Sequence, residues 1–147
     1  MLKERYGSMG IKLIAAGIDG NKWPFKVIDM PRFRQALAFV LAPENRPCLI
    51  HCNKGKHRTG SLIASLRLVR GWALSSVFAE YITFSGARQR LEDQIFIEIF
   101  YKHLVRTGDI QCLLQEEADA IEMAKLSEAA EAGVGETSAL LPSAAPS

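Results

Sequence analysis

The sequence has no apolar run near the ~20 residues that a membrane-spanning helix needs, and its first residues contain no hydrophobic region typical of a secretory signal. Its three cysteines, Cys48, Cys52 and Cys112, cannot all pair with one another. Their spacing fits no zinc-binding pattern, because no second pair follows Cys48 and Cys52. No internal repeat is present. These absences predict a protein of a reducing compartment, the cytoplasm with the nucleus as the alternative, that is neither a membrane protein nor a disulfide or zinc scaffold.

The charge is divided unevenly along the chain. Of 147 residues, 18 are Lys or Arg and 16 are Asp or Glu. Up to Thr107 there are 17 basic and 8 acidic residues, a balance of +9, and from Gly108 onward there are 1 basic and 8 acidic residues, a balance of −7. A basic body attracts polyanions, whereas an acidic tail is repelled by them. We therefore predict one domain over residues 1–107 and an acidic tail, helical and then disordered, over residues 108–147.

Hydrophobic periodicity predicts an α/β protein. Short apolar runs that end in loops indicate buried strands, and apolar residues that recur every three or four positions indicate helices. Asp29 followed by Met30-Pro31 is typical of a helix start, and Ser75 or Ser76 is the expected cap of a later helix. The elements predicted are strands at 11–18 and 48–50, and helices beginning at Asp29, at 58–69, from Ser75 or Ser76 through Phe84, at 91–105 and at 111–132. We expect a parallel sheet flanked by helices.

The chemistry is predicted where the short strand 48–50 meets the helix that follows. A tight loop that leads into a helix N-terminus supplies backbone N–H groups and a favourable dipole for a phosphate. Cys52 begins this loop, and the same surroundings favour its thiolate, the nucleophilic form. Gly55 permits the backbone conformation that such a cradle needs. Arg58 closes the loop with a planar fork that can hold two phosphate oxygens.

Around these residues we predict a set of substrate contacts: Asn53, Lys54, Gly55, Lys56, His57 and Thr59 in the loop, with Asn21 and Lys22 from a second loop. Taken singly, each has a plainer interpretation. A cysteine after an apolar strand is often a small core residue, and the lysines of this loop could form a solvated basic turn or steer substrate electrostatically. The joint spacing of cysteine, glycine, arginine, threonine and glycine is what favours a catalytic loop.

The general acid is the least defined part of the predicted site. Asp19, on the loop after the first predicted strand, is the first candidate, and Asp93 is the second. Asp19 also fits a turn residue beside Gly20. A phosphoanhydride leaving group is itself acidic and needs little protonation, whereas an alkyl or aryl phosphate benefits more from an acid.

The loop Cys52-Asn-Lys-Gly-Lys-His-Arg-Thr-Gly60 resembles that of the protein tyrosine phosphatase superfamily. Lys56-His57-Arg58-Thr59-Gly60 is similar to the atypical dual-specificity phosphatases of plant-and-fungal type. The similarity extends from about Gly10 to Phe100, and it includes Gly17-Ile-Asp-Gly-Asn-Lys22, Leu74-Ser-Ser-Val-Phe78 and Asp93-Gln94. Relatives of this kind carry further residues before the position of Lys12, so the sequence is expected to lack part of the N-terminal sheet, either through a misassigned start or through genuine shortening.

The resemblance implies a parallel sheet between helices, no metal or other cofactor, and a phosphocysteine intermediate on Cys52. It also implies activity on phosphotyrosine-like substrates and, in several members, on the β-phosphate of inositol pyrophosphates. We therefore expect an anionic phosphorylated partner, either an inositol pyrophosphate or a phosphoprotein. The alternative is a pseudophosphatase that binds phosphorylated ligands without turnover. A nucleic-acid-binding module is disfavoured, because the basic residues are not interleaved with aromatics. The oligomeric state is left open.

Overall fold

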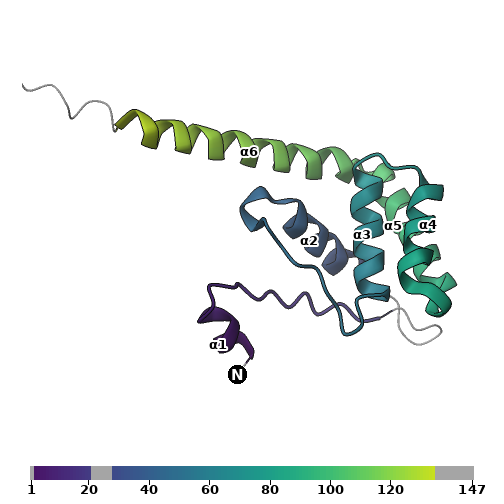
Figure 1. Ribbon diagram of the computed structural model, residues 1–147. Helices are drawn as coiled ribbons and strands as arrows, with labels where there is room; N and C mark the ends of the chain where they lie inside the picture. Colours follow the sequence, from purple (N-terminus) through teal and green to yellow (C-terminus); the bar gives the residue numbers. More distant parts are fainter. Residues whose placement is uncertain (1, 21–27, 135–147) are drawn as a thin grey trace, which may run out of the picture.

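The computed structural model describes residues 2–20 and 28–134. Within these residues the chain forms helices, joined by short turns or by longer segments without regular secondary structure (Figure 1). The helix α3 lies between α2 on one side and α4 and α5 on the other, and α6 extends away from this body (Figure 1). The elements are α1 (Leu2–Gly7), α2 (Met30–Leu41), the 3₁₀ turn η1 (Pro43–Asn45), α3 (His57–Val69), α4 (Leu74–Ser85), the 3₁₀ turn η2 (Gly86–Arg88), α5 (Leu91–Thr107) and α6 (Asp109–Val134).

Local sequence signals set the start of α2 and the end of α5. Asp29 is the N-cap of α2, and its carboxylate accepts a hydrogen bond from the backbone N–H of Arg32 at 3.0 Å. Gly108 ends α5 with a φ of 75°, a left-handed conformation that glycine adopts without strain. The start of α2 is thus confirmed. The predicted cap of α4 was wrong, because α4 begins at Leu74, before either serine, and Ala73 at its N-cap offers no side-chain hydrogen bond.

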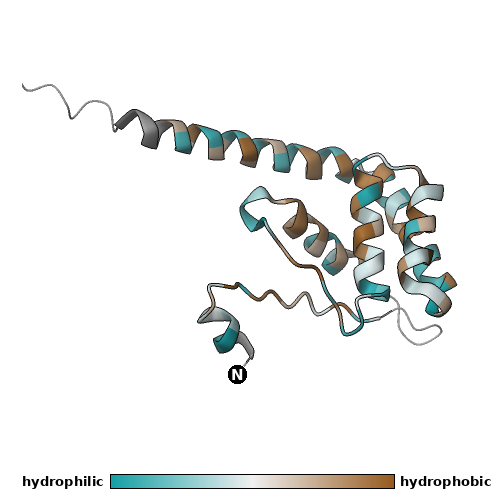
Figure 2. Cartoon of the chain, viewed as in Figure 1, coloured by the Kyte–Doolittle hydropathy of each residue, from teal (hydrophilic) through white to brown (hydrophobic). Residues whose placement is uncertain are grey.

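An aromatic cluster forms the centre of the core. Phe33 of α2 contacts Phe96 and Phe100 of α5 edge-to-face, with ring centroids 4.9 Å apart in both pairs. Buried aliphatic side chains of α2, α3, α5 and α6 surround the rings. Figure 2 shows that apolar residues also occur outside this cluster, among them several in the extended segment after α1. The cluster fixes α2 against α5, with α3 packed beside both.

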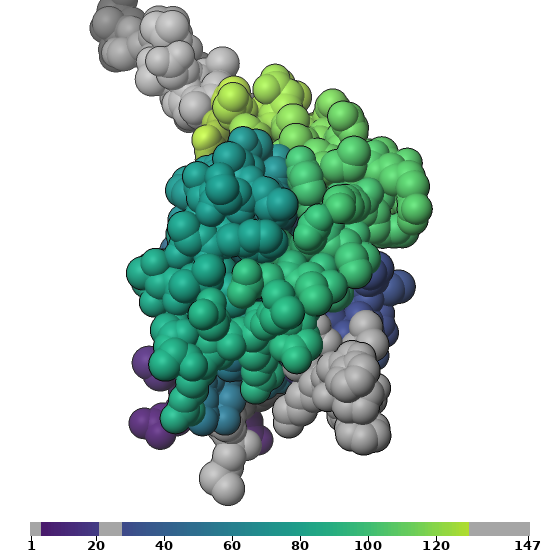
Figure 3. Space-filling model, turned by 90° about the vertical axis from the view of Figure 1, so that its right-hand side faces the viewer, coloured from purple at the N-terminus to yellow at the C-terminus, as the bar shows by residue number. Residues whose placement is uncertain are grey.

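Small residues let α3 pack closely against α4. Ser61, Ala64 and Ser65 of α3 are buried, and a Cβ added at Gly60 would lie 2.9 Å from the ring of Tyr81. A connection of four residues joins the two helices, so they run in opposite directions. The carboxyl end of α4, and with it the turn into α5, therefore lies at the end of the body where α3 begins. Figure 3 shows the face that side chains of α4 and α5 cover.

The two predicted strands are corrected by the structure. Residues 11–20 and 48–52 form neither helix nor strand, and the described residues contain no strand at all. A strand needs a neighbour to complete its hydrogen-bond ladder, and neither segment has one within the described ranges. Their apolar side chains are unevenly covered: Leu49 is 87% exposed and Ile14 48% exposed, whereas Ile18 and Ile50 are partly buried against the core. The parallel sheet of the predicted α/β class is therefore not confirmed, although the predicted helices are present.

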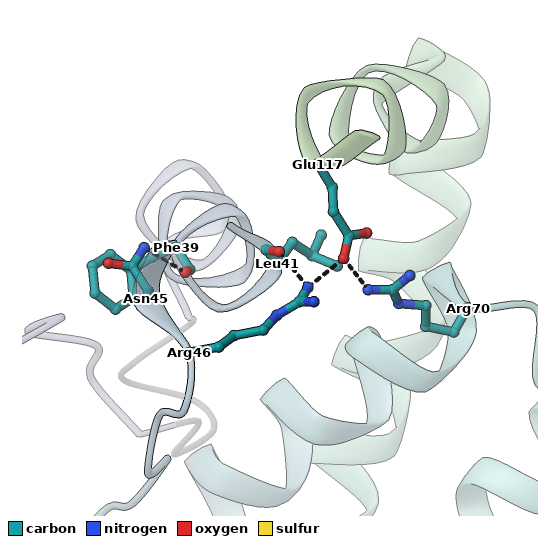
Figure 4. A network of polar contacts seen from close by, with 6 residues as sticks. All are labelled: Phe39, Leu41, Asn45, Arg46, Arg70 and Glu117. Atoms are coloured by element: carbon teal, nitrogen blue, oxygen red, sulfur yellow. Dashed lines mark hydrogen bonds and ion pairs between the residues drawn. The ribbon is translucent and has the colours of Figure 1, made fainter. Parts of the chain in front are cut away.

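The acidic helix α6 is joined to the body by its first turns. Leu113 is buried in the core, and Glu117, 6% exposed, accepts hydrogen bonds from Arg46 after η1 and from Arg70 after α3 (Figure 4). Burial raises the pKa of Glu117, but the two guanidinium groups outweigh it, so the pKa lies below its usual value. The division of the chain after residue 107 stays a prediction. The helix predicted at 111–132 is confirmed, whereas residues 135–147 lie outside the described residues.

No helix in the described part of the chain is both long enough and apolar enough to cross a bilayer.

Candidate active site

The loop that begins at Cys52 leads directly into α3. Gly55 has a φ of 64°, the left-handed conformation that lets the chain turn within the loop. Lys56 occupies the N-cap position of α3, and no side chain caps the helix there. The first backbone N–H groups of α3 are thereby left available for an anion, which is the arrangement that phosphate sites at helix N-termini use.

The surroundings of Cys52 favour its thiolate. Burial alone would raise the pKa of this half-buried thiol, but hydrogen bonds from the Thr59 hydroxyl and from the backbone N–H groups of Thr59, Lys54 and Gly55 lower its pKa to about 6. The buried Thr59 hydroxyl has no competing hydrogen-bond partner among the described residues, so it is available to the thiolate. Near neutral pH the thiol is therefore mostly ionised and nucleophilic.

Two arginines hold the segment that precedes Asp19. A guanidinium nitrogen of Arg58 donates to the carbonyl oxygen of Ile18 at 3.0 Å, and one of Arg32 donates to the carbonyl oxygen of Gly17 at 3.0 Å. These side chains come from the first turns of α3 and α2, so the extended segment is fastened to both helices. Asp19 is exposed and lies at the edge of the same pocket as Cys52.

A single open pocket of about 680 Å³ brings the candidate residues together. Of the predicted site it contains Asp19, Cys52, Asn53, Lys54, His57 and Arg58. Three residues predicted to contact the substrate do not line this pocket. Nζ of Lys56 donates to the carbonyl oxygen of Ser85 at 3.2 Å. Thr59, through its hydroxyl and N–H groups, and Gly55, through its N–H group, donate hydrogen bonds to the sulfur of Cys52. Asn21 and Lys22 lie outside the described residues. The roles assigned to all of these residues stay predictions.

The sequence interpretation missed one wall of the pocket. Arg88, Gln89 and Arg90, from the turn between α4 and α5, line it together with the catalytic loop. Two guanidinium groups thus join Lys54 and Arg58 around a space in which Asp19 is the one carboxylate among the described residues. A signal for this wall was present, because a four-residue connection between α3 and α4 predicts that the end of α4 returns to the start of α3.

His57 is held by a buried carboxylate behind the pocket. Its Nδ1 lies 3.1 Å from Oδ2 of Asp93, and the Tyr81 hydroxyl donates to the same oxygen at 2.8 Å. Asp93 is 1% exposed and does not line the pocket. Burial lowers the pKa of His57 and raises that of Tyr81, so near neutral pH the ring is uncharged and the phenol keeps its proton. This position does not favour Asp93 as an acid that reaches a substrate.

Among residues 2–20 and 28–134, no group of three or more His, Cys, Asp or Glu side chains is arranged to hold a metal ion.

Comparison with known proteins gives concordant matches. Residues 3–116 match the tyrosine phosphatase family. The inositol diphosphatase DSP1 of Oryza sativa subsp. japonica is 48% identical over 99 residues, which cover 65% of this chain and 45% of that protein. The inositol diphosphatase SIW14 of Saccharomyces cerevisiae is 48% identical over 91 residues, covering 62% of this chain and 32% of that protein. The chain thus spans less than half the length of either curated relative.

A solved structure agrees with these relatives. The structure of the Siw14 catalytic core superposes with a TM-score of 0.60 at 39% identity, covering 71% of this chain and 66% of that chain. A second structure, the core catalytic domain of the S. cerevisiae PP-IP phosphatase SIW14 in complex with citrate, gives a TM-score of 0.61 at 38% identity. The described helices are therefore arranged as in a phosphatase catalytic core.

Proposed function

Because the chain belongs to the tyrosine phosphatase family, we propose that it is a cysteine-dependent phosphatase that hydrolyses inositol pyrophosphates and phosphotyrosine-type phosphomonoesters. The observation that carries the proposal is the thiol of Cys52, whose pKa of about 6 makes it a thiolate in the same pocket as Arg58. The thiolate attacks phosphorus and forms a phosphocysteine while the bond from phosphorus to the leaving-group oxygen breaks, and water then hydrolyses that intermediate.

Arg58 has the donors to stabilise the transferring phosphoryl group. Its guanidinium has five N–H groups, and a single one of its nitrogens donates to the carbonyl of Ile18. The remaining donors can hold phosphate oxygens while the charge of the transition state develops. The N-terminus of α3 adds backbone N–H groups at the same place, because no side chain caps it.

The charge of the pocket supports a polyanionic substrate. Lys54, Arg88 and Arg90 lie around the nucleophile, in addition to Arg58. A phosphomonoester requires one dianion site, whereas this wall can contact further phosphates of the same molecule. Two curated relatives are named inositol diphosphatases. We therefore rank the β-phosphate of an inositol pyrophosphate above a phosphotyrosine side chain.

The test is to incubate the purified chain with 5-diphosphoinositol pentakisphosphate and, separately, with a phosphotyrosine peptide, and to measure released phosphate. Wild type is expected to release phosphate from both, with the higher kcat/KM for the diphosphate. Cys52→Ser should release none while it still binds the diphosphate in calorimetry, because serine is not ionised near neutral pH. Turnover that persists in Cys52→Ser would exclude the covalent mechanism, and binding by wild type without turnover would show a pseudophosphatase.

A double variant separates the substrate classes. Arg88→Ala with Arg90→Ala should raise KM for the diphosphate by about tenfold or more, because each charged hydrogen bond contributes about 1.5–3 kcal/mol. KM for p-nitrophenyl phosphate should change little in the same variant, since this small ester has a single phosphate. Equal effects on the two substrates would mean that the arginines only attract anions at long range.

A further inference from the structure

His57 is oriented by two partners from different helices. Nδ1 of the ring lies 3.1 Å from Oδ2 of Asp93, a residue in the first turn of α5. The hydroxyl of Tyr81, on α4, donates a hydrogen bond to the same carboxylate oxygen at 2.8 Å. A carboxylate oxygen accepts hydrogen bonds, so Nδ1 carries the proton in this contact. In the neutral ring the other nitrogen, Nε2, is then the unprotonated one.

His57 lines the pocket that contains the candidate nucleophile. The imidazole lines the pocket that contains Cys52 and Arg58, while its Nδ1 side is directed to the buried Asp93. The groups that face the ring set its charge: Lys56 on its own helix and Arg90 before α5 disfavour the protonated form, and Asp93 favours it. Burial and Arg90 prevail, so the pKa of His57 is lowered and the ring is neutral near pH 7.

We propose that His57 is the general base for hydrolysis of the phosphocysteine intermediate, and that Asp93 and Tyr81 are the residues that position it. This inference rests on the proposed phosphatase function. In the step, a water O–H proton passes to Nε2 while the water oxygen forms a new bond to phosphorus. The P–S bond breaks, its electron pair stays on Cys52 as the thiolate, and inorganic phosphate leaves. The imidazolium then returns its proton to solvent.

The chemistry of the two half-reactions explains why a base is needed in the second. In the first, a phosphoanhydride leaving group departs without much protonation, so an acid contributes little. In the second, the nucleophile is water, a weak nucleophile unless its proton is removed. Cys52 departs as a thiolate that its hydrogen bonds already stabilise. This step therefore requires a proton acceptor, and a neutral imidazole can accept the proton.

The experiment measures the two half-reactions separately in a rapid-quench instrument, with p-nitrophenyl phosphate as substrate. Nitrophenol release reports formation of the intermediate, and mass spectrometry of the quenched protein reports phosphocysteine. In His57→Asn, formation should change by no more than about threefold, while hydrolysis should slow by ~10²-fold and phosphocysteine should accumulate to nearly one per chain. His103→Asn, a histidine of α5 away from the pocket, is the matched control and should behave as wild type.

Two further measurements distinguish a base from a residue that only shapes the loop. In His57→Ala, added imidazole should restore hydrolysis of the intermediate in proportion to its neutral fraction. In Asp93→Asn, the acid limb of the hydrolysis rate should move to lower pH, because Asp93 raises the pKa of His57. Tyr81→Phe should slow hydrolysis by less than Asp93→Asn, because the carboxylate keeps its contact with the ring.

Each contrary result has one meaning. Equal slowing of both half-reactions in His57→Asn, with no rescue by imidazole, would overturn the proposal and leave His57 as a structural part of the loop. Accumulation of phosphocysteine in Asp19→Asn but not in His57→Asn would overturn it in favour of Asp19, a carboxylate that also lines the pocket. A wild-type chain that forms no phosphocysteine at all would overturn the proposed phosphatase function itself.

Discussion

Replacing Thr59 with valine tests how the thiolate of Cys52 is stabilised. Valine keeps the shape of threonine but replaces the hydroxyl with a methyl group, so the hydrogen bond from the side chain is lost while the one from the backbone N–H remains. Thr59→Ser keeps the hydroxyl and is the matched control. Each protein in the comparison also carries Cys48→Ser and Cys112→Ser, so that Cys52 is its single thiol.

The magnitude follows from the pKa of Cys52. At a pKa of about 6 the thiol is ~90% ionised at pH 7, whereas at its ordinary value of 9.0 it would be ~1% ionised. A hydrogen bond to a charged group contributes about 1.5–3 kcal/mol, which corresponds to a pKa change of about one to two. Thr59→Val should therefore raise the pKa of Cys52 to between about 7 and 8 and lower the thiolate fraction at pH 7 to ~10–50%.

The assay is the rate of alkylation by iodoacetamide between pH 4 and 10, read by mass spectrometry, since the thiolate is the form that reacts. The midpoint should lie near pH 6 in wild type and in Thr59→Ser, and at higher pH in Thr59→Val. Coincident midpoints in Thr59→Val and Thr59→Ser would refute the reasoning. The backbone N–H groups of the loop would then account for the whole effect.

Three further substitutions test other contacts. Arg58→Lys keeps the charge but loses the planar fork, so kcat for p-nitrophenyl phosphate should fall by ~10²-fold; an increase in KM alone would restrict Arg58 to substrate capture. Glu117→Gln should lower the melting temperature at pH 7, because it removes the charge that holds two arginines. The pKa of Glu117 is lowered in the folded state, so the difference in melting temperature between variant and wild type should persist above pH 4.5, the ordinary pKa of a glutamate, and vanish as the pH falls through the lowered pKa. A difference in melting temperature that does not change with pH would assign the loss to packing. Gly60→Ala should destabilise the fold by about 1–3 kcal/mol in urea unfolding, since the added Cβ lies 2.9 Å from the Tyr81 ring, and an unchanged midpoint would mean that the ring moves aside freely.

The helices were predictable because their signals are local. Each signal depends on residues within one or two helical turns: the Asp29 cap, the apolar periodicity from 58 to 69, and the glycine that ends α5. Strands at 11–18 and 48–50 were not, because an apolar run becomes a strand only when another strand pairs with it. The described residues provide no such neighbour, and side chains of Arg32 and Arg58 hold the first segment instead.

The same distinction applies to the site. Cys52 and Arg58 stand in one contiguous loop, so their spacing alone predicts that they meet in a pocket. Arg88 and Arg90 come from a turn some thirty residues later in the chain, and only the antiparallel packing of α3 and α4 brings them there. The direction of a side chain is still harder to predict. Lys56 stands within the loop, yet its amine reaches the carbonyl of Ser85 at the end of α4.

The bond from Arg58 to the carbonyl of Ile18 couples two parts of the pocket that are forty residues apart in sequence. One rigid guanidinium plane would contact both the bound phosphate and the main chain immediately before Asp19. The reach of that carboxyl group toward the phosphate therefore depends in part on the geometry of Arg58. A change that tilts the guanidinium displaces the phosphate and the Asp19 segment together, so losses at Arg58 and at Asp19 will not add as independent effects.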